Sequence, residues 1–218
     1  MKLKLAYLIG ALTMASNSNA AVYFLTNVTS GYAYSDGLFQ DTDDSLISGG
    51  IVAMGVFGGT GFDPNNIATS LANFTTLASA QIGSNSTTLA GSFAGYVETK
   101  VDTAAVPLGD PLVGQDLFVF VGNEATLATS TAFGLFKTAV HGADAPLERT
   151  YLANPFDAIA GDALLMGVAG TFTGNASGFE APNAEFTTLK LAAPVPEPSA
   201  AILGGLGALI ACVRRRRN

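Results

Sequence analysis

Three residue types that carry much of protein chemistry are almost missing from this sequence. Its 218 residues include one cysteine, Cys212, one histidine, His141, and no tryptophan. Zinc sites take several cysteine or histidine ligands, so these numbers argue against a zinc protein. A Ser-His-Asp triad would have to use His141, which lies in a loop-like stretch, and the sequence has no Gly-x-Ser-x-Gly motif. We therefore predict no catalytic residues, no cofactor, and a domain that folds without disulfides.

Basic residues are also few, and most of them lie at the two ends of the chain. Lys2, Lys4 and the arginines at 214–217 are six of the ten basic residues, whereas all 17 acidic residues lie between these ends. The part from residue 21 to residue 197 therefore has a net charge of −13. A surface of this sign repels phosphate backbones, so nucleic acid is not an expected partner.

The first 20 residues have the pattern of a secretory signal peptide. Lys2 and Lys4 form a positive segment, residues 5–12 are mostly apolar, and Ser18-Asn19-Ala20 is a small-x-small cleavage site. We expect signal peptidase to cut between Ala20 and Ala21, which makes the following part of the chain an exported one.

The last residues have the pattern of a short membrane helix with a basic end. Residues 200–213 contain no charge and no proline. As a helix they would be ~21 Å long, which is short for a bilayer core of roughly 30 Å. Arginine side chains can extend such a helix by reaching toward the headgroups, and they keep their end cytoplasmic. The basic end of this chain, residues 214–218, contains four such arginines: Arg214, Arg215, Arg216 and Arg217.

A proline-rich linker, residues 192–199, precedes the apolar run, and two of its prolines flank Glu197. Each proline excludes helix and favours an extended backbone before it, which is the form in which proteases and transpeptidases take substrates. The order of motif, apolar run and basic end resembles the PEP-CTERM sorting signal of bacterial envelope proteins. Pro196, Glu197 and Pro198 match its motif residue by residue. The expected sorting motif is Val195, Pro196, Glu197, Pro198 and Ser199.

The resemblance implies an origin, a route and a setting for the protein. It implies a bacterial chain that is anchored transiently in the inner membrane, cut by an exosortase-type membrane enzyme and delivered to the cell surface or extracellular matrix. It also implies a structural or interaction role in producing exopolysaccharide or biofilm, with exopolysaccharide as a possible partner. From the residues themselves two other functions stay open, a carbohydrate-binding module and an envelope glycoside hydrolase that uses two of the carboxylates.

Between the two ends, residues 21–191 predict one all-β domain with one short helix. Short apolar runs separated by Gly, Pro, Asn and Asp favour a single β-sandwich, with a jelly-roll-like topology. Asp63-Pro64 reads as the start of the helix, because Ile67, Leu71, Phe74 and Ala78 recur at helical spacing. The predicted strands lie at residues 22–28, 51–57, 93–101, 117–121, 133–136, 147–152, 164–168 and 186–191.

A small acidic cluster is the one candidate metal site. Asp41, Asp43 and Asp44 offer the oxygen ligands that calcium prefers. Their spacing lacks the glycine and the distal glutamate of an EF-hand, so we interpret the cluster as a solvated acidic loop and keep calcium as a weak candidate.

Overall fold

A computed structural model of the chain describes residues 22–27, 37–59, 61–83, 85–86, 91–102, 114–140, 150–152, 155, 159, 163–174 and 185–194. The predicted signal peptide, membrane helix and basic end lie outside these residues. Across the part of the chain that is described, no helix has both the length and the apolar character needed to cross a membrane.

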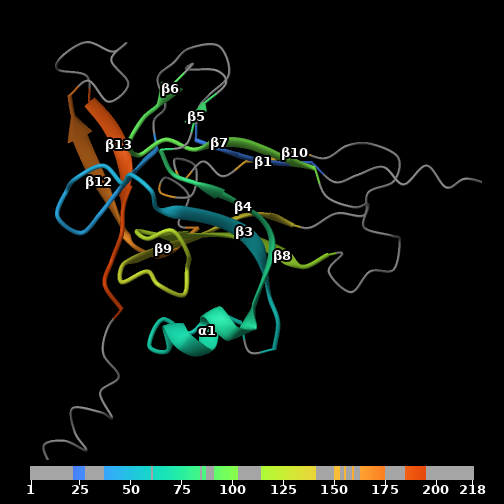
Figure 1. The fold of residues 1–218 in the computed structure, drawn as a ribbon. Coiled ribbons are helices and arrows are strands. Elements are labelled where there is room, and N and C mark those ends of the chain that lie inside the picture. Colours follow the sequence, from blue (N-terminus) through green and yellow to red (C-terminus); the bar gives the residue numbers. More distant parts are fainter. Residues whose placement is uncertain are drawn as a thin grey trace, which may run out of the picture.

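The described residues confirm a mainly β fold with one short helix, α1 (Ile67–Asn73) (Figure 1). The strands are β1 (Val22–Thr26), β2 (Leu38–Gln40), β3 (Ile51–Phe57), β4 (Phe74–Gln81), β5 (Asn85–Ser86), β6 (Gly91–Ser92), β7 (Glu98–Asp102), β8 (Asp116–Gly122), β9 (Phe133–Val140), β10 (Thr150–Leu152), β11 (Leu164–Met166), β12 (Val168–Thr173) and β13 (Glu185–Lys190).

The central layer is a five-stranded sheet with the order β11-β9-β8-β3-β4, in which all neighbours are antiparallel. Side chains alternate between its two faces, as the period of a strand requires. On β8, Leu117, Val119 and Val121 enter the main core. Phe118 and Phe120, from the same strand, belong to a second cluster on the other face. Both faces of the sheet are therefore covered by apolar packing.

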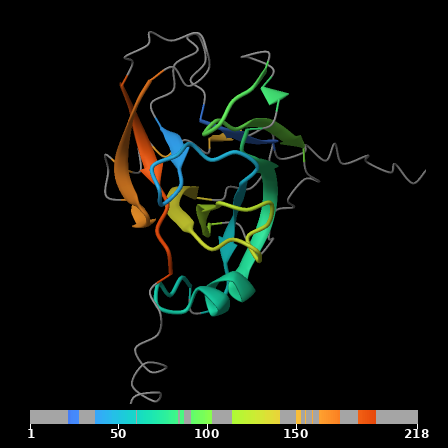
Figure 2. The same ribbon diagram turned by 60° about the vertical axis from the view of Figure 1, so that its left-hand side comes forward.

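Two three-stranded sheets contribute to the main core from the other side. Their orders are β10-β1-β7 and β12-β13-β2, and each contains one parallel pair, β1 with β10 and β13 with β2. Leu25 of β1, Phe39 of β2 and Leu189 of β13 are fully buried in the same cluster as the inner face of β8. In Figures 1 and 2 the β10-β1-β7 sheet lies above the central sheet, strands β12 and β13 lie at its left, and α1 lies below it.

Helix α1 covers the outer face of the central sheet. It begins later than the predicted start at Asp63-Pro64, and it ends before Phe74 and Ala78, which the spacing had assigned to the helix. Its N-cap is Asn66, whose side chain accepts a hydrogen bond from the Thr69 N–H at 2.9 Å. Asp63 instead closes a turn before the helix by accepting from the Asn65 N–H. The prediction was wrong for Phe74 and Ala78, which lie in β4 and pair with β3. Pairing along a whole strand outweighs the helical spacing of two apolar side chains.

The predicted strand at 164–168 is two strands that belong to different sheets. Gly167, with a φ of +98°, separates β11 from β12. A Cβ atom at this position would lie 2.8 Å from a Leu189 side-chain carbon and 2.9 Å from the Lys190 carbonyl oxygen. Glycine therefore permits both the left-handed backbone and the close approach that lets the chain pass from one sheet to the next.

Candidate functional site

The predicted sorting motif begins three residues after Ala192, the last paired residue of the fold. Leu191 is buried and donates its N–H to the Gln40 carbonyl at 2.9 Å. Ala192 pairs with Phe133 through two backbone hydrogen bonds of 2.9 Å each. Pro194 is the last described residue. Three predicted sites therefore lie outside the described residues: the sorting motif at 195–199, the basic residues at 214–217, and the cleavage site at Ala20 and Ala21.

The acidic cluster forms a closed turn between β2 and residue 46. The Asp41 N–H donates to the Ser45 carbonyl at 2.9 Å, and the Asp44 N–H donates to the Asp41 carbonyl at 3.2 Å. Asp44 has a φ of 70°, which aspartate tolerates better than most residues with a Cβ atom. Gln40 and Leu46 close the turn with a β-bridge.

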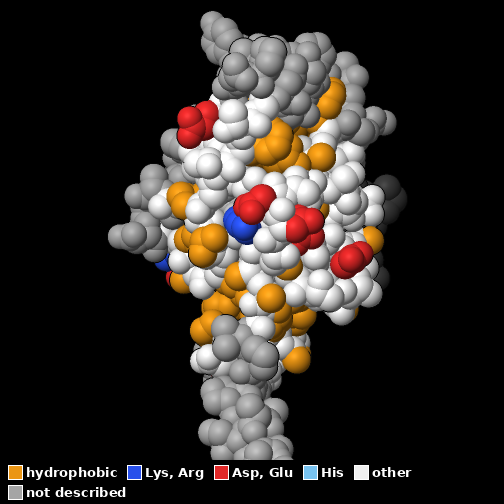
Figure 3. All heavy atoms as spheres, turned by 90° about the vertical axis from the view of Figure 1, so that its left-hand side faces the viewer, with side chains coloured by type: hydrophobic (Ala, Val, Ile, Leu, Met, Phe, Trp, Pro, Cys, Tyr) orange, Lys and Arg blue, Asp and Glu red, His pale blue; other side chains and the backbone are white. Residues whose placement is uncertain are grey.

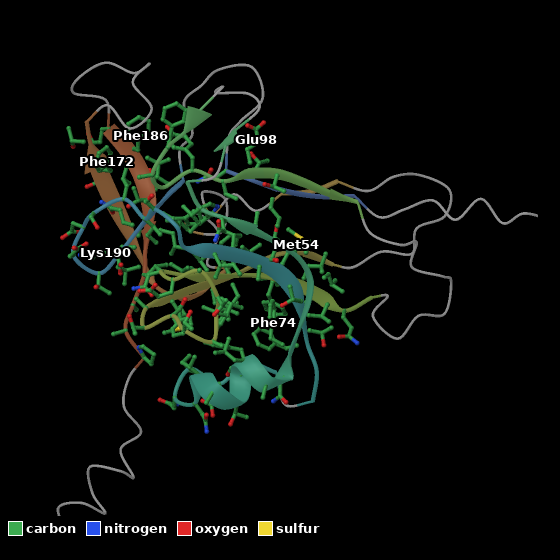
Figure 4. The ribbon with its side chains drawn as sticks, viewed as in Figure 1. Met54, Phe74, Glu98, Phe172, Phe186 and Lys190 are labelled. Carbon is green, nitrogen blue, oxygen red and sulfur yellow. The ribbon has the colours of Figure 1, made fainter. Side chains whose placement is uncertain are left out.

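Each carboxylate of the turn has different partners. Asp41 accepts from the Asn123 side chain at 3.1 Å and from the Thr42 N–H at 2.7 Å. Asp44 forms an ion pair of 2.6 Å with Lys190 of β13. Figure 3, viewed from the side on which Lys190 lies in Figure 4, shows acidic side chains around a basic one on this face. The turn is thus fixed to two other parts of the fold.

Within the described part of the chain, Asp43 takes its side-chain hydrogen bonds from nearby Ser45, and Lys190 adds a weaker electrostatic attraction. The Asp43 carboxylate accepts from the Ser45 hydroxyl at 2.6 Å and from the Ser45 N–H at 3.0 Å. These hydrogen bonds favour the charged form and hold the pKa of Asp43 below its usual value. The stabilisation that they give is present above the unfolded pKa and is lost as the pH falls through the lower, folded pKa.

A buried glutamine, Gln40, connects the acidic turn to neighbouring strands through its side-chain hydrogen bonds. Gln40 is 1% exposed, and its side-chain oxygen accepts from the Thr188 hydroxyl. Its side-chain nitrogen donates to the carbonyl oxygens of Asp44 at 3.0 Å and Thr171 at 3.3 Å. One side chain therefore joins the turn to β12 and β13, and sequence patterns gave no sign of it because its partners are distant along the chain.

Asn27 has a similar role at the end of β1. Its side chain is fully buried and donates to the carbonyl oxygens of Gly37 at 3.0 Å and Gly95 at 2.8 Å. Its side-chain oxygen accepts from the Val97 N–H at 3.0 Å. Asn27-Val28-Thr29 fits the N-glycosylation pattern, but an amide that is buried and bonded at both ends is closed to modification.

The geometry offers little to a metal ion. Among the residues that the structure describes, no group of three or more His, Cys, Asp or Glu side chains could hold one. Asp41, Asp43 and Asp44 are neighbours in sequence, yet an amide, a hydroxyl and an ammonium group respectively bind them. A cation would have to displace these partners before the three carboxylates could bind it.

We expect calcium to change the stability of this domain only slightly. Because the carboxylates already have partners, millimolar calcium should raise the melting temperature of a fragment of residues 21–194 by less than about 3 °C. Differential scanning calorimetry with calcium, and with magnesium as the matched control, measures this. A calcium-specific shift above about 10 °C would correspond to several kcal/mol of binding and would restore the calcium site.

The glycines that follow β3 belong to a turn. Gly59 and Gly61 have positive φ angles of 61° and 79°. The Gly61 N–H donates to the Gly58 carbonyl at 3.3 Å. His141 lies outside the described residues.

The fold and these contacts define an all-β domain whose polar side chains mainly join its strands and loops. Comparison of the chain with protein-family models, with curated proteins and with solved structures found no match.

Proposed function

We propose that this chain is an exported bacterial protein of the cell surface or extracellular matrix, sorted by a PEP-CTERM-type signal. Its role would be that of a structural or interaction protein, associated with exopolysaccharide or biofilm, and not enzymatic. The observation that supports this most is the junction at Ala192, where the paired backbone of the fold gives way to Pro196-Glu197-Pro198, an apolar run and four arginines.

The junction suits processing by a membrane enzyme. Ala192 is held by Phe133, and four residue steps separate it from Pro196, a reach of at most about 14 Å. The two prolines keep the peptide out of a helix, so its backbone can enter an extended binding groove. The arginines stay on the cytoplasmic side and halt translocation, so the sorting motif lies on the outer side of the inner membrane.

For the domain itself, we propose a β-sandwich. The packing of Leu25, Phe39 and Leu189 against the inner face of the five-stranded sheet supports two facing layers. A jelly roll is antiparallel, and the five-stranded sheet fits that pattern. The parallel pairs β1–β10 and β13–β2 do not, so the jelly-roll likeness is limited to one layer.

Intact mass spectrometry of the protein released from the cell surface tests the sorting proposal. We expect the released wild-type protein to begin at Ala21 and to lack residues 214–217. Glu197→Ala should impair removal of the tail while membrane insertion continues, because Glu197 lies outside the apolar run. Replacing the four arginines with serine should instead disturb topology and retention.

The matched control for this experiment is Glu185→Ala. Glu185 is an exposed residue of β13, so its loss removes the same charge without touching the motif. Processing should be unchanged. A released wild-type protein that still carries Arg214 to Arg217 would mean that the tail is a plain anchor, and the sorting proposal would fail.

A further inference from the structure

The chain leaves the fold beside helix α1. Phe133, whose backbone holds Ala192, packs in the same aromatic cluster as Ile67 and Leu71 of α1. In both ribbon views the last described residues run down toward α1, which lies at the bottom of the coloured part of the molecule (Figures 1 and 2). One end of the domain, which we name the α1 end, therefore combines α1 with the exit of the chain.

The length of the linker between the fold and the apolar run limits the distance between the α1 end and a membrane that contains the tail. Six residue steps join Pro194 to Ala200, where the apolar run begins. Even a fully extended chain spans only roughly 20 Å over this distance. A compact domain of about 170 residues has a radius of gyration of roughly 15 Å, so its diameter exceeds the length of this tether. The orientation of the domain therefore decides which side chains meet the lipid headgroups.

Charge distinguishes the α1 end from the rest of the exported part. Residues 64–73, which lead into and form α1, carry no charge, although the exported part has 17 acidic residues. The exposed positions of α1 are Ala68, Thr69 and Ala72, all neutral. Asp63, just before the helix, is an exposed acid that belongs to this end, because its backbone is hydrogen-bonded to the Ser70 hydroxyl of α1.

Several other acidic side chains lie on other parts of the molecule. The turn at Asp41–Asp44 is fixed to Lys190 on a lateral face (Figures 3 and 4). Glu98 lies on the side opposite to α1 (Figure 4). Glu185, at the start of β13, is separated from Ala192 by the length of that strand. An anionic membrane would repel these groups within a Debye length of about 8 Å.

We propose that the α1 end is the surface that this protein turns toward the anionic lipid headgroups while its tail is in the membrane. The short tether holds the domain close. Repulsion of the more acidic faces leaves the α1 end, where the helix is uncharged and Asp63 precedes it, as the favoured contact. This inference rests on the proposed membrane-held precursor. It adds an orientation that the sorting signal alone does not specify.

Site-specific quenching in vesicles tests the orientation. The full chain with Cys212→Ser is reconstituted into vesicles of phosphatidylethanolamine and phosphatidylglycerol, with a fluorophore on Ala72→Cys or on Thr173→Cys. Both positions are exposed, and Thr173 pairs with Glu185, about 20 Å along β13 from the exit. Nitroxide on the lipid headgroups should quench the Ala72 probe at least twofold more than the Thr173 probe.

A charge variant tests the reason for the orientation. Ala68→Glu adds an acid to the first turn of α1, where it favours the helix, so loss of folding is not expected. It should reduce quenching of the Ala72 probe, whereas Thr171→Glu on β12, an exposed position of the other layer, should not.

The outcomes separate two failures. A chain that does not float with the vesicles contradicts both the membrane-held precursor and the orientation. A chain that floats but is quenched equally at both positions, or more at Thr173, leaves the precursor intact and overturns the orientation. Equal quenching with and without Ala68→Glu overturns the electrostatic cause.

Discussion

Replacing Phe120 with alanine will lower the free energy of unfolding by about 3–5 kcal/mol, a large part of the 5–15 kcal/mol that small domains have. Phe120 is fully buried on the outer face of β8, so the smaller side chain leaves a cavity that the surrounding rings cannot fill. Its ring centroid lies within 6.4 Å of four others, those of Phe57, Phe62, Phe74 and Phe133.

Urea unfolding of a fragment of residues 21–194 measures this loss. The midpoint should be the same with and without reducing agent, because the fragment has no cysteine. The matched control is Leu165→Ala, which truncates a side chain that is 44% exposed and should cost less than about 1 kcal/mol. If Phe120→Ala cost no more than Leu165→Ala, the aromatic cluster under α1 would not be part of the cooperative core.

Asn27→Ala will also destabilise the domain strongly, by about 3 kcal/mol, although Asn27 is polar. The change removes the side-chain partner of the buried Gly37 carbonyl and of the buried Val97 N–H, whereas the Gly95 carbonyl keeps its hydrogen bond from the Phe39 N–H at 3.1 Å. Each buried polar group that loses its hydrogen bond costs ~1–3 kcal/mol, and shared relaxation keeps the total below the sum. Chemical denaturation of the same fragment measures the effect.

Asn66→Ala provides the control for this second substitution. It makes the same chemical change at the N-cap of α1, where one hydrogen bond to Thr69 is lost at the surface. A loss of about 1 kcal/mol is expected there. If the two asparagine variants were equally stable, the three contacts of Asn27 would add nothing beyond an ordinary cap.

The strands with long apolar runs could be predicted from the sequence. The predicted strand at 51–57 coincides with β3, because its β-branched and apolar residues favour a strand buried on both faces. Strand β4 was missed because Phe74 and Ala78 continue the helical spacing of Ile67 and Leu71. In β4 the intervening Thr75 and Thr76 favour a strand, and they pair with Val56 and Gly55.

Strand β12 was missed beyond Val168 for a different reason. None of its residues is fully buried, so its sequence does not show the run or alternation of apolar residues by which a strand is recognised. It forms because six residue pairs join it to β13, a partner distant in sequence. The same holds for the polar contacts of the acidic turn. The aspartates were evident, but Gln40 acts through Thr188, which is 148 residues away, and no local pattern encodes such a pairing.

The last paired segment also determines how the domain bears mechanical load. A pull on the tail reaches β13 through Ala192 and acts nearly along the strand, because the chain continues in the direction of β13 (Figures 1 and 2). The six residue pairs with β12 and the three with β2 run across that direction, so they are sheared together instead of being peeled apart one by one. A protein held at a surface by this end would resist drag as a unit.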